Sequence, residues 1–269
     1  MAETEMLMLQ DVHKTFNPGT ATEKKALNGV SLTLNSGDFV TVIGGNGAGK
    51  STMLNAIAGT FHLDCGILRI AGREVAHLPE YKRAAFLGRV FQDPNSGTAA
   101  SMNIEENLAL ASRRGLPRGL RWGITADERA RYREKLAALD LGLETRLSSK
   151  VGLLSGGQRQ ALTLLMATLK EPELLLLDEH TAALDPKTAE KVLSLTRRLI
   201  RENHLTALMV THNMKDALAL GNRTIMMHEG RIILDLNAEQ KQHMTVEDLL
   251  AQFEKVSGLE LANDRMLLV

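Results

Sequence analysis

A short glycine-rich stretch constrains the fold of this chain more than any other feature. It runs Gly44-Gly45-Asn46-Gly47-Ala48-Gly49-Lys50-Ser51-Thr52 and fits the pattern G-x-x-x-x-G-K-[ST]. An apolar, β-branched run at residues 39–43 comes directly before it, and residues 51–59 have the composition of a helix that ends at a glycine. Strand, loop and helix in this order are the setting that the pattern requires. We therefore expect an α/β fold built around a phosphate-binding loop.

The chemistry of such a loop follows from its residue types. Backbone N–H groups and the lysine cradle the phosphates of a nucleotide, and the helix N-terminus adds partial positive charge. We expect Lys50 to contact the β- and γ-phosphates and Ser51 to bind Mg²⁺. The rest of the expected phosphate site is Gly45, Asn46, Gly47, Ala48, Gly49 and Thr52. The alternative, a glycine-rich turn beside an exposed lysine, is disfavoured by the flanking strand and helix.

A second polar pair follows a run of four leucines. Residues 174–177 are all leucine, which is typical of a strand buried on both faces of a parallel sheet. Asp178 and Glu179 then fall at the carboxyl end of that strand, where polar side chains project into a ligand crevice. We expect Asp178 to hold Mg²⁺ and Glu179 to act as the general base on the attacking water. The alternative is a core strand that ends in solvated acids.

Two further residues end apolar runs. His212 follows the run at residues 205–210, and Gln92 follows Val90-Phe91. We expect His212 to contact the γ-phosphate or its water, although a lone histidine is more often a surface or core residue. The amide of Gln92 is expected to sense both the metal and the water.

Composition restricts the class of protein. Lys+Arg and Asp+Glu both number 32 in 269 residues, so no net charge favours nucleic acid. The single cysteine, Cys65, excludes an internal disulfide and fits a reducing compartment. The first residues lack the basic and apolar segments of a signal peptide. No apolar run approaches the ~20 residues that span a bilayer, so a membrane role needs partner subunits.

The order of the expected elements suggests one domain over residues 1–269 with a helical insertion. We place a core at about 1–92 and 158–255 and a helical subdomain at about 93–157. Strands are expected at residues 6–14, 30–34 and 68–70, and a hairpin at residues 225–236. Helices are expected at residues 103–112, 126–139, 187–203 and 245–255. A basic segment containing Arg113, Arg114, Arg118, Arg121 and Trp122 is interpreted as a solvated surface of the subdomain or, alternatively, a partner-docking edge.

A second motif, Leu154-Ser155-Gly156-Gly157-Gln158, accompanies the glycine-rich loop. Together with Gln92, the acidic strand end, Ala183-Leu184-Asp185 and His212, all in family order, it makes residues 6–255 resemble the ATP-binding cassette (ABC) ATPases. The resemblance implies a P-loop NTPase (RecA-like) core with an antiparallel β subdomain and an inserted α-helical subdomain. It also implies ATP and Mg²⁺ as cofactors.

The same resemblance implies how the site is completed. Two copies would form a head-to-tail dimer, with Ser155 and Gly157 of one copy on the γ-phosphate that Lys50 of the other holds. Gly156, Gln158 and Asp185 belong to this expected nucleotide site. Phe16 matches an aromatic residue that stacks on adenine in relatives, and its alternative role is packing.

The expected function is the ATPase subunit of a membrane transporter, of the importer type. Its partners would be a second copy, integral membrane permease subunits and an extracytoplasmic substrate-binding protein, at the cytoplasmic face of the membrane. The alternatives are a lipid or lipoprotein extractor, an exporter, and a soluble ABC ATPase. The subgroup resemblance gives amino acids, including aromatic ones, as the substrate class.

Two further segments of the chain carry local expectations. His180 follows Glu179 where many relatives have proline, and is interpreted as a tolerated loop variant or as a group that alters pH dependence. Residues 93–103 are expected to form the groove for a permease helix, with Met102, Ile104 and Leu108 supplying apolar contact; the alternative is an ordinary surface loop.

Overall fold

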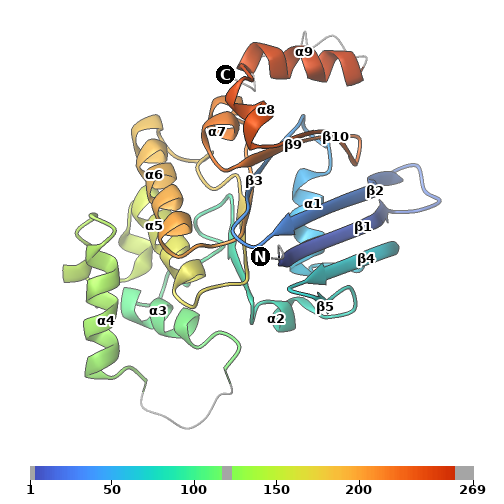
Figure 1. The fold of residues 1–269 in the computed structure, drawn as a ribbon. Helices are drawn as coiled ribbons and strands as arrows, with labels where there is room; N and C mark the ends of the chain where they lie inside the picture. The colour runs from blue at the N-terminus through green and yellow to red at the C-terminus, as the bar shows by residue number, and fades with distance from the viewer. Residues whose placement is uncertain (1–3, 117–122, 258–269) are drawn as a thin grey trace. The chain divides into compact units, whose positions relative to one another are not determined.

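The structure is a computed structural model that describes residues 4–116 and 123–257 (Figure 1). Contacts between Cα atoms divide the chain into two compact units. The first contains the segments up to Arg83 and from Leu205 onward, and the second runs from Ala84 to His204. Each unit is described by itself.

The first unit contains an antiparallel sheet with the strand order β2-β1-β4-β5. Its strands are β1 (Glu5–Phe16), β2 (Lys24–Asn35), β4 (Cys65–Ile70) and β5 (Arg73–Glu74). Leu7, Leu9 and Val12 of β1 are all buried. Leu7 lies opposite Leu34 of β2 and opposite Ile70 of β4. Apolar residues from three strands thus meet on one face of the sheet, as the alternating sequence predicts.

The first unit also holds four strands in the order β10-β9-β3-β8. They are β3 (Phe39–Ile43), β8 (Ala207–Val210), β9 (Arg223–His228) and β10 (Arg231–Leu236). Strand β3 is parallel to both β8 and β9, and β10 returns antiparallel to β9. Every residue of β3 is buried, so this strand forms the centre of the unit and carries the glycine-rich loop at its end.

Short helices surround these strands. They are α1 (Lys50–Ala58), α2 (Glu80–Arg83), α7 (Met214–Ala219), α8 (Ala238–Gln242) and α9 (Val246–Ser257). Leu249 and Phe253 of α9 pack into a cluster with Ile43 and Met226. The amphipathic pattern of the last helix therefore serves to cover the end of β3.

A buried arginine of α2, Arg83, binds the C-terminal end of helix α1. Arg83 is 1% exposed, and its guanidinium donates to the carbonyl oxygens of Ala56 and Ile57 at 2.7 and 3.0 Å. These carbonyls lie in the last turn of α1, where a cation is favourable. Burial lowers the pKa of Arg83, and four backbone carbonyl acceptors compensate for the lost hydration.

The described residues of the second unit include two parallel strands, four α-helices and two short 3-10 helices. Strands β6 (Leu87–Val90) and β7 (Leu174–Asp178) pair in parallel, with Val90 opposite Leu177. The helices are α3 (Ile104–Ser112), α4 (Ala126–Ala137), α5 (Gly156–Thr168) and α6 (Pro186–Glu202). Helices α3, α4 and α5 lie between β6 and β7 in the chain, and of these α3 and α4 fall within the segment 93–157 that the sequence predicts to be a helical subdomain.

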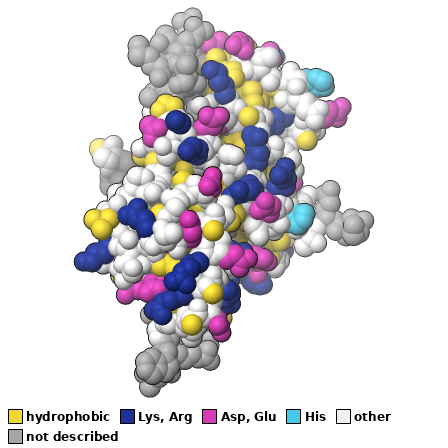
Figure 2. All heavy atoms as spheres, turned by 90° about the vertical axis from the view of Figure 1, so that its left-hand side faces the viewer, with side chains coloured by type: hydrophobic (Ala, Val, Ile, Leu, Met, Phe, Trp, Pro, Cys, Tyr) yellow, Lys and Arg dark blue, Asp and Glu magenta, His cyan; other side chains and the backbone are white. Residues whose placement is uncertain are grey.

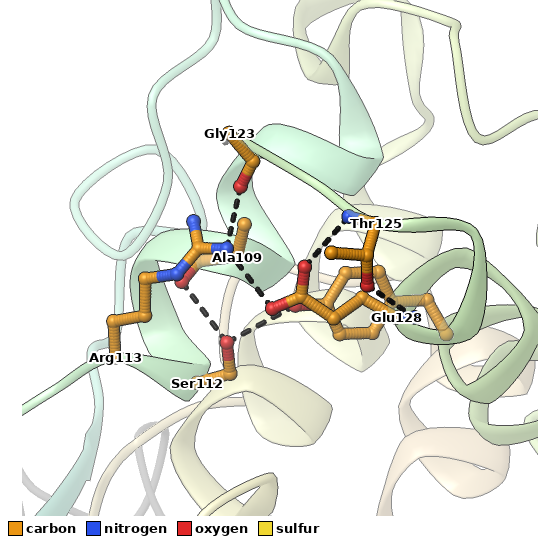
Figure 3. A network of polar contacts seen from close by, with 7 residues as sticks. Ala109, Ser112, Arg113, Gly123, Thr125 and Glu128 are labelled. Atoms are coloured by element: carbon orange, nitrogen blue, oxygen red, sulfur yellow. Dashed lines mark hydrogen bonds and ion pairs between the residues drawn. The ribbon is translucent and has the colours of Figure 1, made fainter. Parts of the chain in front are cut away.

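A polar network joins α3 to the start of α4 (Figure 3). The Arg113 guanidinium donates to the carbonyl of Gly123 at 2.5 Å and to Glu128 Oε1 at 2.9 Å. Glu128 also accepts from the backbone N–H of Thr125 at 2.8 Å and closes a capping box at the start of α4. Arg113 thus fixes the chain at the point where it enters α4.

The elements expected from the sequence are largely confirmed. Each strand and helix named from the sequence is present. The largest difference is in β2, which begins at Lys24 and not at residue 30, while β5, α2, α7 and α8 were not expected. The contacts separate the units at Arg83 and His204, not near residues 92 and 157. They group β6, α5, β7 and α6 with the inserted helices. The domain boundaries proposed from the sequence stay a prediction.

Replacement of Gly221 by alanine is expected to destabilise the first unit strongly. Gly221 has φ +70°, and a Cβ there would lie 2.0 Å from the carbonyl oxygen of Phe39 at the start of β3. Gly37 is the matched control, because it has φ +84° and nothing within 4 Å of an added Cβ. Backbone strain alone predicts a loss of about 1–2 kcal/mol for Gly37→Ala, and the added clash predicts roughly 3 kcal/mol or more for Gly221→Ala. Equal losses in urea unfolding would contradict the close approach.

Candidate functional site

The glycine-rich loop curls around the side chain of Lys50. The Lys50 ammonium is buried and donates to the carbonyl oxygens of Gly44 and Gly45 at 2.7 and 3.0 Å. Gly49 caps α1 with φ +103° and offers no side chain to the helix end. Ser51 and Thr52 follow in the first turn. A buried cation, a helix N-terminus and a loop without bulky side chains together form an anion site.

Backbone from distant segments encloses the loop within the first unit. A Cβ on Gly44 would lie 2.2 Å from the carbonyl oxygen of Met227, and one on Gly49 would lie 2.5 Å from that of Ala26. The N–H of Gly230 donates to Ala48 at 2.9 Å. These glycines are therefore required by close backbone approach as well as by their positive φ.

The end of β1 and the start of β2 lie beside the loop. Phe16 lies opposite Lys24 in the strand pair, and Lys24 Nζ comes within 3.1 Å of a Cβ built on Gly47. Phe16 is half-buried and makes an edge-to-face contact with Phe61, with 5.3 Å between ring centroids. This position beside the loop fits a base-stacking role, while the Phe61 contact also gives Phe16 a packing role.

His212 lies at the same edge of the strands as the loop. The N–H of Thr211 donates to the carbonyl of Val42 at 3.1 Å, so β8 stays beside β3 up to the residue before His212. Asn213 then caps α7 by accepting from Asp216 at 3.1 Å. His212 is half-buried between these two anchors. The first unit therefore places the expected switch histidine at the carboxyl end of the strand next to β3.

The acidic pair ends strand β7 in the second unit. Glu179 is buried and adopts φ +45°, the left-handed region that residues other than glycine rarely enter. Asp178 Oδ2 lies 3.9 Å from a guanidinium nitrogen of Arg89 on β6. Arg89 also stacks over the ring of Phe91 at 4.5 Å. A cation thus faces the carboxylate that the sequence assigns to Mg²⁺.

Gln92 lies near the acidic pair in register. Val90 of β6 lies opposite Leu177 of β7. Gln92 follows Val90 by two residues and Glu179 follows Leu177 by two residues, so the two side chains belong to equivalent positions at the ends of neighbouring parallel strands. The preceding carbonyl, that of Phe91, accepts from Gln160 Nε2 of α5 at 3.2 Å. The strand end that carries Gln92 is therefore held by the helix that follows the second motif.

Ser155 starts helix α5 with a reciprocal cap. Its Oγ accepts from the N–H of Gln158 at 3.3 Å, and its own N–H donates to Gln158 Oε1 at 3.2 Å. Because Oγ accepts in the cap, its hydroxyl proton stays available for an anion. A Cβ on Gly157 would lie 2.1 Å from Thr188 Cγ2 in α6, while Gly156 is exposed. Packing between α5 and α6 thus requires the second glycine of the motif.

The segment after Glu179 leads into α6. Asp185 caps α6 by accepting from the N–H of Thr188 at 3.1 Å, and hydrogen bonds from Thr188 lower the pKa of Asp185. His180 is 1% exposed, and burial lowers the pKa of its imidazole to about 4. The imidazole is therefore neutral near pH 7.

One expectation for the permease groove is wrong. Ile104 and Leu108 are completely buried within the second unit, because α3 uses them for its own packing, so they cannot contact a partner. Met102 is half-buried. Large exposed apolar side chains of this unit include Leu110 and Leu153, at 52% and 72%.

The basic segment is partly used inside the unit. Arg113 binds Glu128, and the Arg114 guanidinium donates to the carbonyls of Ala167 and Lys170 at 3.3 and 3.2 Å near the end of α5. Arg118, Arg121 and Trp122 lie outside the described residues. On the face shown in Figure 2, basic and acidic side chains are interspersed. This mixture agrees with the neutral composition.

Within residues 4–116 and 123–257, no helix has the length and apolar character needed to cross a bilayer.

Comparison with known proteins settles the family. Residues 27–182 match the family model described as ABC transporter. A tyrosine transport ATP-binding protein of Clostridioides difficile is 42% identical over 249 residues, which are 93% of this chain and 99% of that protein. The chain belongs to the ABC transporter ATP-binding proteins.

Other relatives agree with this membership. The thiamine import ATP-binding protein ThiQ of Salmonella choleraesuis is 36% identical over 202 residues, 75% of this chain and 81% of ThiQ. The ATP-binding cassette MJ0796, solved as a dimer in a post-hydrolysis state with ADP and Pi, has a TM-score of 0.74 and 32% identity. That match covers 87% of this chain and 99% of MJ0796. The expected ABC fold and ATPase function are confirmed: this ABC cassette binds and hydrolyses ATP as a transporter subunit.

Each unit contains side chains with the oxygen donors that Mg²⁺ prefers. These are the hydroxyl of Ser51 in the first unit, and the carboxylate of Asp178 and the amide of Gln92 in the second. Within the described residues there is no cluster of three or more His, Cys, Asp or Glu that would form an all-protein metal cage. A site of few protein ligands completed by phosphate oxygens is the usual arrangement for this ion.

Three residues beside the site were not found from the sequence. Lys24 lies at the phosphate loop, Arg89 faces Asp178, and Gln160 holds the Phe91 carbonyl. An arginine inside the otherwise apolar run Leu87–Val90 was a usable signal for Arg89. Neither Lys24 nor Gln160 stands in a motif, because their roles depend on cross-strand and helix packing.

Burial of neutral His180 predicts a pH-dependent loss of stability. The folded pKa of about 4 lies below the ordinary value of 6.5, so below pH 6.5 the unfolded chain takes up a proton that the folded chain does not. Stability is therefore lost as the pH falls from 6.5 toward 4. Between pH 7.5 and 5 the loss is about 2 kcal/mol.

The measurement is urea unfolding of the wild type and His180→Gln at both pH values. The variant lacks this titration, so the stability difference between the two proteins should shrink or reverse at pH 5. A difference that does not change with pH would show that His180 titrates normally.

Proposed function

We propose that this ABC cassette holds ATP at the Lys50 loop and hydrolyses it with Glu179, within a dimer of two copies. The observation that carries the proposal is the loop itself: a buried ammonium beside the N-terminus of α1, enclosed by backbone. This is the geometry of a polyphosphate site.

Each proposed site residue has a separate role in phosphoryl transfer. The Lys50 ammonium offsets charge on the β- and γ-phosphates. Glu179 takes a proton from the attacking water while the water oxygen bonds to the γ-phosphorus. The bond between the γ-phosphorus and the bridging oxygen breaks, and ADP leaves with that oxygen. His212 and Gln92 orient the water and the γ-phosphate. Phe16 stacks on the adenine base.

Ser51, Asp178 and Gln92 would hold Mg²⁺, which neutralises charge that develops on the phosphate oxygens. Arg89 lies 3.9 Å from Asp178 and holds this carboxylate in place for the metal.

The second copy completes the site. Ser155 opens α5 with a hydroxyl proton that it can donate to phosphate. The N-terminus of α5 favours an anion in the same way as that of α1. A γ-phosphate held by Lys50 of one copy would therefore bridge to Ser155 and the Gly156-Gly157 backbone of the other. MJ0796, solved as a dimer, supports this arrangement.

Import is the proposed direction of transport. Relatives with import or transport names handle tyrosine, thiamine and methionine, and the tyrosine protein matches nearly end to end. Amino acids, aromatic ones included, are therefore the proposed substrate class. The proposed partners are permease subunits and an extracytoplasmic binding protein, with this chain peripheral at the cytoplasmic face.

Removal of the loop cation is expected to abolish tight ATP binding. Lys50→Ala deletes the buried ammonium and should raise the ATP Kd by on the order of 100-fold or more, since charge-assisted bonds to phosphate are strong. Isothermal titration calorimetry measures this, with Lys25→Ala, an exposed lysine of β2, as the control. Unchanged affinity in Lys50→Ala would refute the phosphate site.

Substitutions of Asp178 and Glu179 are expected to change different steps of the reaction. Glu179→Gln keeps the shape but cannot accept a proton, so turnover should fall by roughly 10²–10⁴-fold with ATP affinity retained. Asp178→Asn should weaken Mg²⁺-dependent ATP binding itself. Steady-state turnover and ATP titration in the presence of Mg²⁺ separate the two effects. Equal loss of affinity in both variants would make Glu179 structural or a metal ligand.

The segment from Asp93 to Asn103 is expected to contact the permease. It follows Gln92, and its backbone is held by Asn107, which exchanges hydrogen bonds with Ala99 at 2.8 and 3.1 Å. A cysteine at exposed Ser101 should form disulfide crosslinks to cytoplasmic loops of the permease in the assembled complex. A cysteine at exposed Lys187 of α6 is the control. Absence of any product from Ser101→Cys would favour an ordinary surface loop.

A further inference from the structure

His180 makes a hydrogen-bond chain that fixes its own tautomer. Its Nε2 lies 3.0 Å from Thr196 Oγ1, and Thr196 Oγ1 donates to the carbonyl of Val192 at 2.8 Å. A hydroxyl carries one proton, and here that proton goes to Val192. Thr196 Oγ1 must therefore accept from His180, so the neutral ring carries its proton on Nε2.

The chain is fully removed from water. His180 is 1% exposed and Thr196 is completely buried. Nδ1 of His180 is buried without a hydrogen-bond partner among the described residues. A buried ring that leaves one nitrogen unsatisfied is costly, so the bond from Nε2 to Thr196 is the ring's one compensation within the described part of the chain.

The segment that contains His180 is tied to α6 at both ends. His180 binds Thr196 in the middle of the helix, and Asp185 binds Thr188 in its first turn. Between them, the N–H of Ala182 donates to Glu179 at 3.0 Å. The seven residues from Glu179 to Asp185 are therefore attached to α6 at two points.

Glu179 needs such an anchor because its backbone is strained. It adopts φ +45°, and a residue with a Cβ stays in this region only when its surroundings hold it there. The next residue along the chain is His180, whose side chain bonds to Thr196 of α6.

We infer that His180 is a positioning residue for Glu179: its Nε2–H bond to Thr196 holds the backbone that aims the Glu179 carboxylate and couples that carboxylate to α6. The inference rests on the proposed role of Glu179 as general base. In this chain the histidine achieves the restraint through Thr196.

The test removes the Thr196 hydroxyl, which accepts from His180, while the side chain at position 196 keeps nearly the same shape. Thr196→Val is nearly isosteric with the wild type but cannot accept from Nε2, whereas Thr196→Ser keeps the hydroxyl. His180→Gln keeps an amide N–H near the position of Nε2, and His180→Leu does not. All four full-length variants are compared in ATP turnover, KM and thermal unfolding, beside Glu179→Gln.

Positioning predicts a specific pattern of kinetic constants. Thr196→Val and His180→Leu should lose on the order of 10- to 100-fold in kcat, because a small misplacement of a catalytic group has such effects. KM should stay within about twofold, since ATP binding does not use the histidine. Thr196→Ser and His180→Gln should keep most of the activity. The double variant His180→Leu/Thr196→Val should be no worse than either single one.

Other outcomes overturn the inference and are distinguishable. If Glu179→Gln is slow but Thr196→Val keeps its kcat and loses only thermal stability, His180 is a packing residue and the proposed function stands. If Glu179→Gln turns over normally, the proposed function itself fails. The wild type gives a check that needs no variant: ¹⁵N NMR of labelled histidine should show the His180 proton on Nε2, and a proton on Nδ1 would contradict the chain.

Discussion

The first unit depends on close contact between backbone groups around the phosphate loop. The turn between β9 and β10 is the point where three segments meet. Gly230 donates to Ala48 at 2.9 Å and accepts from Asn28 of β2 at 2.8 Å, so one residue joins the loop to the antiparallel sheet. Any side chain at Gly44 or Gly49 would collide with carbonyl oxygens of Met227 or Ala26. The loop conformation, and with it the position of Lys50, is therefore set by backbone packing that few substitutions can preserve.

The second unit is organised around helix α6 in a comparable way. Gly157 lets the start of α5 approach Thr188, Asp185 caps the helix, and His180 binds Thr196. The motif that would meet the partner's phosphate and the acid that would activate water are thus both anchored to one helix.

Much of this could be predicted from the sequence, because the informative segments are local. The β-branched run before Gly44 and the four leucines before Asp178 each give a strand whose end carries polar groups, and both strands are present. The hairpin at Glu229-Gly230 and the capped helix after Thr245 were likewise encoded by short-range signals. Contacts between segments far apart in the chain gave no such signal. Arg83 at the end of α1 and Lys24 at Gly47 depend on pairings of this kind. Arg89 stands out within its apolar run, but its neighbour Asp178 lies on another strand. The expected exposure of Ile104 and Leu108 failed because α3 turns both residues into the core of its unit.

The central claim is that one ATP is held by Lys50 of one copy and Ser155 of another, and complementation tests it directly. Two full-length variants, Lys50→Ala and Ser155→Arg, are prepared with Glu179→Gln in both chains so that ATP is not consumed. Light scattering then measures the mass of each variant alone and of their equal mixture with ATP and Mg²⁺. The account predicts that each variant alone stays monomeric. The mixture should form a dimer that binds one ATP per pair, because one complete site remains. Association of Ser155→Arg alone, or a mixture that stays monomeric while the Glu179→Gln protein dimerises, would contradict the shared site.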